Sequence, residues 1–401
     1  MPRYPSVRLR PWIVAATIIV GANAPSNVFA AGWTSTDIGD VGVAGTADRS
    51  AGVWTVLGAG GDIWGDADAF QFVHAPALGN GGNIAVRVDD LQDTNPFAKA
   101  GIMLRGSLDA NAATVLIDVK PNSEVEFMKR SSAGASMTYV TGTFVTLPVW
   151  LQLSWVGGTV TASVSQDGQA WAALGQVDVV MPATTTEAGA IVTSHDTSQL
   201  NTAHFERLSL LPADWTSTDI GATGLPGSAL IDLSGCGCNP IWRVEGAGGD
   251  VWGSSDSFQF VHRTFSGDFN VDWNVLSLDA THPFAKAGLM VRDGLASNAV
   301  NMILDVKPSG EVEFMARECE SCETQYLAGA TVTLPADLYI RRRGSTFDAL
   351  VGEYGHGTSG VPPQLVGSVT LPVGDSVEVG FAVTSHDTTK LAGAAFDHPA
   401  R

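Results

Sequence analysis

Basic side chains are scarce in this sequence. Its 401 residues include 22 lysines and arginines against 41 aspartates and glutamates, which gives a formal net charge of −19 at pH 7. A surface of this sign repels the phosphate backbone of nucleic acids and tolerates bound cations. The composition therefore predicts that nucleic acid is not a partner, and it keeps calcium open as a ligand.

Long hydrophobic runs are also lacking, apart from one near the N-terminus. Arg3, Arg8 and Arg10 precede an apolar stretch at 12–22, and Val-Phe-Ala at 28–30 fits a cleavage site. The apolar run is too short to span a bilayer comfortably, so the pattern predicts a signal peptide at 1–30. We expect a secreted, extracellular or periplasmic protein with no membrane span after cleavage. The mature chain would carry 19 basic and 41 acidic residues, a formal charge of −22.

One segment of the sequence occurs twice. Residues 58–74 read GAGGDIWGDADAFQFVH and residues 246–262 read GAGGDVWGSSDSFQFVH, with 13 of 17 positions identical at an offset of 188. Other motifs recur in the same order: WTSTDIG at 33 and 215, PFAKAG at 96 and 283, DVKP at 118 and 305, EVEFM at 124 and 311, and TSHDT at 193 and 384. Such a match indicates a duplicated domain. We divide the mature chain into repeats at 31–211 and 212–401, with a short linker at 210–214.

Short alternating runs, rather than helical periodicity, fill each repeat. Gly, Asn, Asp and Pro separate these runs, which in the first repeat lie at 69–74, 83–88, 101–105, 114–119, 124–128, 149–155, 160–165 and 188–193. Many short strands in fewer than 200 residues are typical of two antiparallel sheets packed face to face. The sequence predicts an all-β fold of two tandem antiparallel β-sandwiches of the jelly-roll type. Trp64, Phe70, Phe72 and Phe127 are the expected core.

These motifs resemble a domain that is common in secreted bacterial proteins. The resemblance is carried in both copies by the 58–74 block, PFAKAGIMLR at 96–105, DVKPN and EVEF at 118–127, and the TSHD turn at 193–196. On these residues each repeat resembles the concanavalin A-like lectin/glucanase superfamily, close to the laminin-G-like modules. The resemblance implies a concanavalin A-like sandwich. Since the superfamily holds lectins, glycan-binding modules, adhesion modules and glycosidases, it does not select a function.

Catalytic motifs are absent from the sequence. The glycosidases of the superfamily carry Glu-x-Asp-x-x-Glu on one strand, and retaining hydrolysis needs two carboxylates about 5–5.5 Å apart. Here Glu124 and Glu126, like Glu311 and Glu313, are separated by a valine, and the third acid is missing. No nucleophile elbow, zinc-protease motif or phosphate-binding loop is present. The sequence therefore predicts a protein that is not an enzyme.

Polar residues that both copies share are the candidate ligand-binding groups. Strand alternation places Lys99 and Arg105 on one face of a strand and Asp118 on a face of the next. Their counterparts are Lys286, Arg292 and Asp305. One interpretation is a concave polar floor that hydrogen-bonds sugar hydroxyls. The other is a ladder of structural ion pairs between neighbouring strands.

Aspartates in the repeated block suggest a second kind of site. Asp62 and Asp68 lie in a glycine-flanked segment, as do their counterparts Asp250 and Asp256. Oxygen ligands from such a loop can hold calcium. The alternative is local turn bonding by short acidic side chains. No cofactor other than calcium is expected.

Cysteine is rare and confined to the second repeat, at Cys236, Cys238, Cys319 and Cys322. The first repeat has none, so the cysteines are an addition to the fold rather than its foundation. In an exported chain we expect them to be oxidised. We favour bridges between the two clusters, which would close a loop of about 80 residues, because a Cys-x-Cys bridge is strained. A Cys₄ zinc site is the rival interpretation.

The sequence as a whole predicts a secreted, non-catalytic protein that binds an extracellular polysaccharide or another glycan through tandem lectin-like sandwiches. The alternative is a structural or adhesive extracellular protein that binds a surface protein; a glycoside hydrolase ranks third. Exposed tryptophans would be natural sugar platforms, because aromatic faces stack on sugar rings. Trp150, Trp155 and Trp171 occur only in the first repeat and Trp273 only in the second, so we expect either that the two repeats bind different ligands or that only one of them binds.

The duplication also predicts that each repeat folds by itself. Residues 31–211 expressed alone should unfold cooperatively and show a strong β signature by circular dichroism, because each copy has its own set of strands. A disordered fragment beside a folded full-length chain would show that the boundary or the autonomy is wrong.

Overall fold

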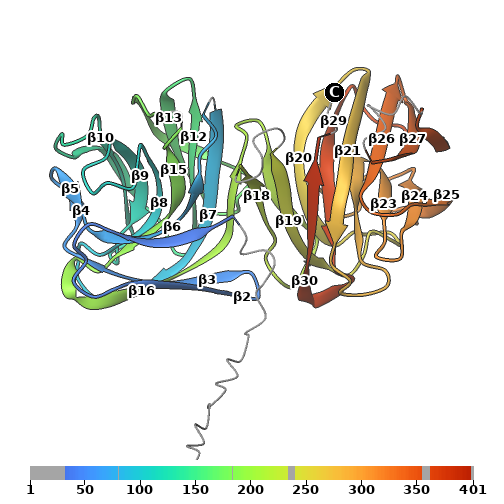
Figure 1. The fold of residues 1–401 in the computed structure, drawn as a ribbon. Coiled ribbons are helices and arrows are strands. Elements are labelled where there is room, and N and C mark those ends of the chain that lie inside the picture. The colour runs from blue at the N-terminus through green and yellow to red at the C-terminus, as the bar shows by residue number, and fades with distance from the viewer. Residues whose placement is uncertain (1–31, 80, 183, 234–239, 355–361, 399–401) are drawn as a thin grey trace, which may run out of the picture.

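The computed structural model describes residues 32–79, 81–182, 184–233, 240–354 and 362–398, so the predicted signal peptide lies outside the described residues. In this part of the chain every regular element is a strand. Among these residues no helix has the length and apolar character needed to cross a membrane. The prediction of an all-β protein built as two tandem antiparallel sandwiches is confirmed. Figure 1 shows the two units side by side.

The first repeat contains sixteen strands. They are β1 (Thr34–Ile38), β2 (Thr46–Ser50), β3 (Val53–Gly60), β4 (Ile63–Trp64), β5 (Ala67–Asp68), β6 (Phe70–Pro76), β7 (Gly81–Leu91), β8 (Lys99–Arg105), β9 (Thr114–Val119), β10 (Glu124–Arg130), β11 (Thr138–Phe144), β12 (Val149–Val156), β13 (Thr159–Ser165), β14 (Ala172–Asp178), β15 (Glu187–Thr193) and β16 (Asp196–Leu211). All eight runs predicted from the sequence coincide with strands of this set.

The second repeat follows the same plan. Its strands are β17 (Thr216–Ile220), β18 (Ser228–Asp232), β19 (Ile241–Gly248), β20 (Phe258–Ser266), β21 (Phe269–Leu278), β22 (Lys286–Arg292), β23 (Asn301–Val306), β24 (Glu311–Arg317), β25 (Gln325–Thr331), β26 (Ala336–Arg343), β27 (Thr346–Glu353), β28 (Gln364–Thr370), β29 (Ser376–Thr384) and β30 (Asp387–Asp397). The described residues include no counterpart of the β4–β5 pair, which is reduced to one bridge between Asp250 and Ser257.

Each repeat has one sheet of its own, which we call the separate sheet. Its order is β1-β6-β15-β8-β9-β10-β11 in the first repeat and β17-β20-β29-β22-β23-β24-β25 in the second. A single sheet of 14 strands, the shared sheet, runs through both repeats and packs against both separate sheets. Strand alternation sends apolar side chains into the space between the sheets, as with Ile102 and Ile117 from the separate sheet and Leu151 and Phe205 from the shared sheet. These side chains form the main core of the first repeat.

The two repeats are joined through β16 and β18. These strands pair in parallel at Leu210 and Leu230, and the backbone N–H of Ala229 donates to Ser209 Oγ at 3.1 Å. Leu230 belongs to the core of the first repeat, whereas Leu211 belongs to that of the second. The predicted linker at 210–214 is therefore in part a strand, because the sheet continues through the junction.

Polar contacts reinforce the same junction. The Nδ2 of Asn83 donates to the carbonyl oxygens of Pro212, at 2.8 Å, and Trp215, at 3.0 Å. Arg49 of β2 forms an ion pair with Glu245 of β19 and donates to Ser228 Oγ at 2.9 Å. Burial raises the pKa of Glu245, and Arg49 opposes that rise. The pair thus gives a largely buried carboxylate a cationic partner between the repeats.

One disulfide joins Cys319 to Cys322, whose Cα atoms lie 5.3 Å apart in the turn that links β24 to β25. The prediction of bridges from this pair to Cys236 and Cys238 is wrong, as is a zinc site that uses these two sulfurs. The turn brings Cys319 and Cys322 to ordinary bridging distance without help from the rest of the chain. Cys236 and Cys238 lie outside the described residues.

The junction ion pair can be tested with Arg49→Ala. We expect the variant to lose about 2–3 kcal/mol of unfolding free energy at pH 7, because Glu245 stays buried without its cation. The folded-state pKa of Glu245 is already raised, so its ionised form is the costly one. The loss should therefore shrink as the pH falls and Glu245 takes up a proton. Urea unfolding at pH 7 and pH 4.5 measures both quantities, and Arg341→Ala, at a more exposed pair, is the control. An equal loss at both pH values would contradict this account.

Candidate functional site

The middle of the repeated block, the β4–β5 hairpin, lies across the outer face of the separate sheet, the face that points away from the sandwich core. In the first repeat the β4–β5 hairpin places Ile63 against Phe70, Phe72 and Met103, and these residues form a second, smaller apolar cluster. Val251 takes the place of Ile63 in the second repeat, against Phe258, Phe260 and Met290. Part of the outer face is thereby covered in both copies.

A buried aspartate ties the hairpin to the sheet. Asp68 accepts two hydrogen bonds from Arg130, at 2.5 Å and 2.7 Å, and one longer contact of 3.4 Å from Arg105. The side chains of all three residues are inaccessible to solvent. Arg130 also donates to the Ala135 carbonyl, and Arg105 to that of Ser107. Paired, forked donors are the arrangement in which a buried carboxylate is stable.

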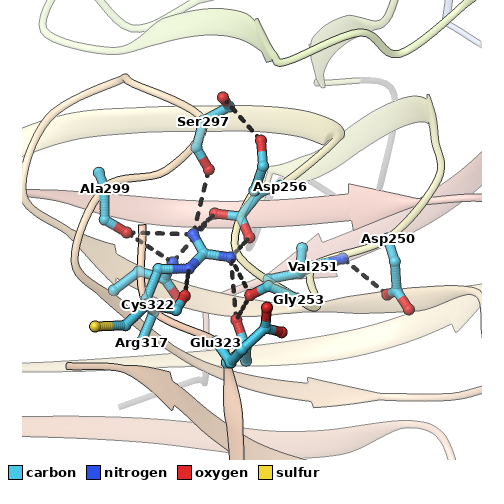
Figure 2. Close-up of polar contacts among 12 residues, drawn as sticks. Asp250, Val251, Gly253, Asp256, Ser297, Ala299, Arg317, Cys322 and Glu323 are labelled. Atoms are coloured by element: carbon cyan, nitrogen blue, oxygen red, sulfur yellow. Dashed lines mark hydrogen bonds and ion pairs between the residues drawn. The ribbon is translucent and has the colours of Figure 1, made fainter. Parts of the chain in front are cut away.

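The second repeat contains the same arrangement. Figure 2 shows the Arg317 guanidinium donating to both oxygens of Asp256, at 2.6 Å and 2.8 Å, and to surrounding backbone carbonyls. One of these carbonyls belongs to Cys322, so the disulfide turn supports this arginine. Arg292 donates to Asp256 at 3.2 Å. We call the two sets, Asp68 with Arg105 and Arg130 and Asp256 with Arg292 and Arg317, the arginine clamps.

Two predicted ligand-binding residues are therefore structural. Arg105 and Arg292 are fully buried in the arginine clamps, and burial lowers the pKa of Arg105 to about 10 while Asp68 opposes that fall. Strand alternation correctly placed both arginines on the outer face. The hairpin that covers them comes from a distant part of the sequence, and no local pattern reports it.

The predicted calcium ligands do not fit a calcium ion. Both oxygens of Asp68 and of Asp256 face guanidinium groups, and an oxygen of Asp62 or Asp250 accepts a lysine ammonium at 2.6 Å. Across the described ranges no three His, Cys, Asp or Glu side chains gather in a way that would hold a metal ion. The cations that these aspartates bind are the protein's own.

Beside each clamp lies a polar cluster, which we name the outer-face site. In the first repeat it consists of Asp62, Lys99, Asp118, Lys120 and Glu126. Lys99 Nζ lies 2.6 Å from Asp62 and 3.2 Å from the Phe97 carbonyl oxygen, and Lys120 Nζ lies 3.1 Å from Glu126. Both lysines are almost fully buried. The second site contains Asp250, Lys286, Asp305, Lys307 and Glu313.

Asp118 occupies the floor of this site. Its cross-strand neighbours are Gly101 on β8 and Glu126 on β10, and a Cβ on Gly101 would lie 2.5 Å from Asp118 Cα. Asp118 is fully buried, and neither of its carboxylate oxygens has a hydrogen-bond partner among the described residues. Burial raises its pKa well above the ordinary range. Asp305 has the same burial, the same pair of unpartnered oxygens and the same direction of pKa change.

Exposed aromatic residues accompany both sites. Trp64, Phe97 and Tyr139, and their counterparts Trp252, Phe284 and Tyr326, all have between 46% and 54% of their surface exposed. The prediction of Trp64 as core is wrong, because the hairpin buries Ile63 and turns Trp64 outward. Phe70, Phe72 and Phe127 are buried as predicted. The sequence analysis did not single out Phe97 and Tyr139, although a large aromatic at the same surface position in both copies is a usable signal.

Phe97 links the aromatic and polar parts of the site. Its ring centroid lies 5.6 Å from Lys120 Nζ and 5.3 Å from the His195 ring. His195 has a positive φ of 56° and sits 3.4 Å from Asp62. Phe284, Lys307 and His386 repeat this arrangement, and burial lowers the pKa of His386. In each repeat a half-exposed phenyl ring therefore lies against a buried ammonium group.

A cleft of about 530 Å³ at the junction is a different hollow, lined in part by Trp150, Arg207 and Asp219. The Arg207 guanidinium lies 5.7 Å from the Trp150 ring centroid and also pairs with Asp219. A candidate sugar platform from the sequence, Trp150, thus already has a cation of the protein against it. The aromatic residues that both repeats share are better placed for a ligand.

No family model matches this chain, and no curated protein matches it. Similar solved structures include a functionally unknown protein from Saccharomyces cerevisiae, with 15% identity and a TM-score of 0.36 over 46% of this chain and 97% of that one. The carbohydrate binding module CBM66 from Bacillus subtilis has 17% identity and a TM-score of 0.29, over 45% and 95%. The exoplasmic/lumenal domain of VIP36 in its Ca²⁺/Man-bound form has 11% and 0.30, over 45% and 83%. The fold of this chain is shown by its own strand pairing.

The arginine clamp predicts a strong stability effect. Asp68→Asn should lower the unfolding free energy of the first repeat by about 3–5 kcal/mol, because two buried arginines lose their anion. Asp66→Asn, at an exposed position of the same hairpin, should change it by less than about 0.5 kcal/mol. Arg105→Ala with Arg292→Ala should likewise melt far below the wild type. Urea unfolding measures these effects, and a clamp variant as stable as the Asp66 control would refute the structural role.

Proposed function

We propose that this protein is a non-catalytic polysaccharide-binding protein that acts outside the cell and uses the two outer-face sites. The observation that carries the proposal is a half-exposed phenylalanine, Phe97 or Phe284, that lies against the same charged cluster in both repeats. Exposed aromatic surface is normally avoided, so its presence at equivalent positions of both copies supports a binding role. Aromatic faces stack on the C–H faces of sugar rings, and nearby charged groups hydrogen-bond to hydroxyls.

The state of the carboxylates favours binding over hydrolysis. Glu124 and Glu126, the acids nearest to a glycosidase pattern, both pair with Lys120, at 2.8 Å and 3.1 Å. Glu311 and Glu313 pair with Lys307 in the same way. A nucleophile or general base has to reach its substrate, whereas these acids are held by a neighbouring ammonium group. The proposed role of the four glutamates is therefore to hold the lysines of the site.

Each outer-face site is expected to bind weakly, with a dissociation constant between about micromolar and millimolar, because a sheet face offers little enclosure. Each separate sheet carries one such site, so one chain offers two. Two linked sites on one polymer raise the apparent affinity by about 10²–10⁴ without any new contact. The duplication thus supplies a physical reason for useful retention on a long polysaccharide.

The proposal predicts that retention depends on both phenylalanines. Phe97→Ala or Phe284→Ala alone should lower retention on an insoluble polysaccharide by about tenfold or more, because one stacking surface and part of the avidity are lost. The double variant should be retained no better than a non-binding protein. Pull-down across a panel of insoluble polysaccharides measures this directly.

Phe144→Ala is the matched control for that experiment. Phe144 is 71% exposed on the edge strand β11, but its counterpart is Thr331, so it is not part of the repeated surface. Full retention of the double phenylalanine variant, or equal loss in the Phe144 control, would count against the outer-face sites. Failure of the wild type on every polysaccharide, with capture of a surface protein, would favour the adhesive alternative.

A further inference from the structure

We propose that Asp118 and Asp305 are the recognition groups of the two outer-face sites, and that each accepts hydrogen bonds from a ligand. The ligand class is then a glycan that presents a donor group to a carboxylate, either a pair of hydroxyls or an ammonium group, and acidic glycans are excluded. This inference rests on the proposed function and specifies its chemistry.

The first observation is that both aspartates are fully buried and lack partners. Within the described residues, none of the four carboxylate oxygens of Asp118 and Asp305 accepts a hydrogen bond. A buried acceptor without a donor destabilises the folded protein unless another molecule supplies the donor. The arrangement occurs in both copies. By contrast, the buried aspartates of the arginine clamps accept hydrogen bonds from arginine side chains.

The neighbouring cations do not supply the missing donors. Lys99 is directed to Asp62 and the Phe97 carbonyl, and Lys120 is directed to Glu124 and Glu126. In the second site Lys286 and Lys307 are held in the same way, by Asp250 and by Glu311 and Glu313. Every ammonium group of the site therefore already has a carboxylate, and Asp118 and Asp305 are the acids left over.

The residues next to Asp118 are partly exposed to solvent. On one side the strand floor is glycine, at Gly101, and on the other side its neighbour Glu126 keeps 14% of its side chain exposed. Asp62 keeps 24% exposed. Solvent thus reaches two of the acids beside Asp118, and Phe97 is half-exposed next to the same cluster. A sugar ring stacked on Phe97 would bring its hydroxyl or amino groups toward these acids.

The charge of the site decides which glycans it accepts. In the first repeat four acids, Asp62, Asp118, Glu124 and Glu126, surround two lysines, Lys99 and Lys120, and one histidine, His195, which leaves an excess of acid. The second repeat has the same balance, and the whole chain has a net charge of −19. Uronate or sulfate groups would meet repulsion both at long range and at the site itself. Neutral or amine-bearing glycans would not.

The same chemistry gives a pH dependence. Asp118 is faced by Lys99, Glu126, Asp62 and Lys120, and burial raises the pKa of its carboxyl well above the ordinary range. A ligand that donates hydrogen bonds favours the ionised form and lowers the pKa of Asp118 on binding. Affinity for a neutral glycan, which does not titrate, should therefore rise with pH through the raised pKa and then level off.

The test compares the full-length chain with its Asp118→Asn/Asp305→Asn variant on three immobilised polymers, a neutral β-glucan, a glucosamine polymer and polygalacturonate. Asp66→Asn/Asp293→Asn removes two exposed charges and is the matched control. We expect the site variant to lose about 10- to 100-fold in retention on the polymer that the wild type binds, with a melting temperature equal to or above that of the wild type. The control should lose nothing, and polygalacturonate should not be retained.

The three polymers show which chemical group of the ligand donates the hydrogen bond. Loss on the β-glucan assigns a hydroxyl pair, and loss on the glucosamine polymer alone assigns an ammonium group. Unchanged retention of the site variant, or retention of the wild type on polygalacturonate, would overturn this inference while leaving polysaccharide binding intact. No retention of the wild type on any polymer would overturn the proposed function and this inference with it.

Discussion

The structure depends on a buried carboxylate held between two guanidinium groups. Asp68 is the last residue of a short hairpin, and its partners Arg105 and Arg130 come from two strands of the separate sheet. Three buried charges are tolerable only because every one of them has fixed partners at short range. This interaction positions the hairpin over the sheet, and with it the second apolar cluster beneath Ile63. The arginine clamp thus holds Ile63 against this apolar cluster.

The clamp also determines which part of the outer face stays open. The hairpin covers the end of the sheet that carries Arg105 and Arg130. The cross-strand pair of Asp118 and Glu126 lies next to this covered end. Phe97 remains half-exposed next to that pair, against Lys120. The outer-face site is thus the remainder of a sheet face that a hairpin covers only in part. The second repeat has the same arginine clamp and the same polar site beside it.

Duplication had a second consequence at the junction. The two repeats share one sheet through β16 and β18, and each contributes a leucine to the core of the other. Arg49 and Glu245 add a largely buried ion pair to the same place. The two repeats are therefore joined through one continuous sheet and an ion pair. Two sites linked in one chain raise the effective concentration for a ligand that spans both.

Alternation of side chains was sufficient to predict much of this architecture. The eight predicted runs are strands, the repeat predicts the tandem plan, and the faces of Lys99, Arg105 and Asp118 follow from their order along the strands. Sequence identity between the copies also identified the motif that becomes the hairpin. These inferences succeed because a strand has a period of two, so neighbouring residues alone decide which way a side chain points.

The tertiary structure alone shows which side chains on a sheet face are covered by other segments of the chain. Arg105 and Asp118 share the outer face, but one is paired by Asp68, 37 residues away in the sequence, and the other is left without a donor. Trp64 and Ile63 are adjacent, yet one is exposed and the other buried. Likewise Cys319 pairs within its own turn. The sequence by itself determined the strands, the duplication and the side on which each residue lies. The tertiary structure decided burial and pairing, because these depend on contacts between segments that local periodicity does not relate.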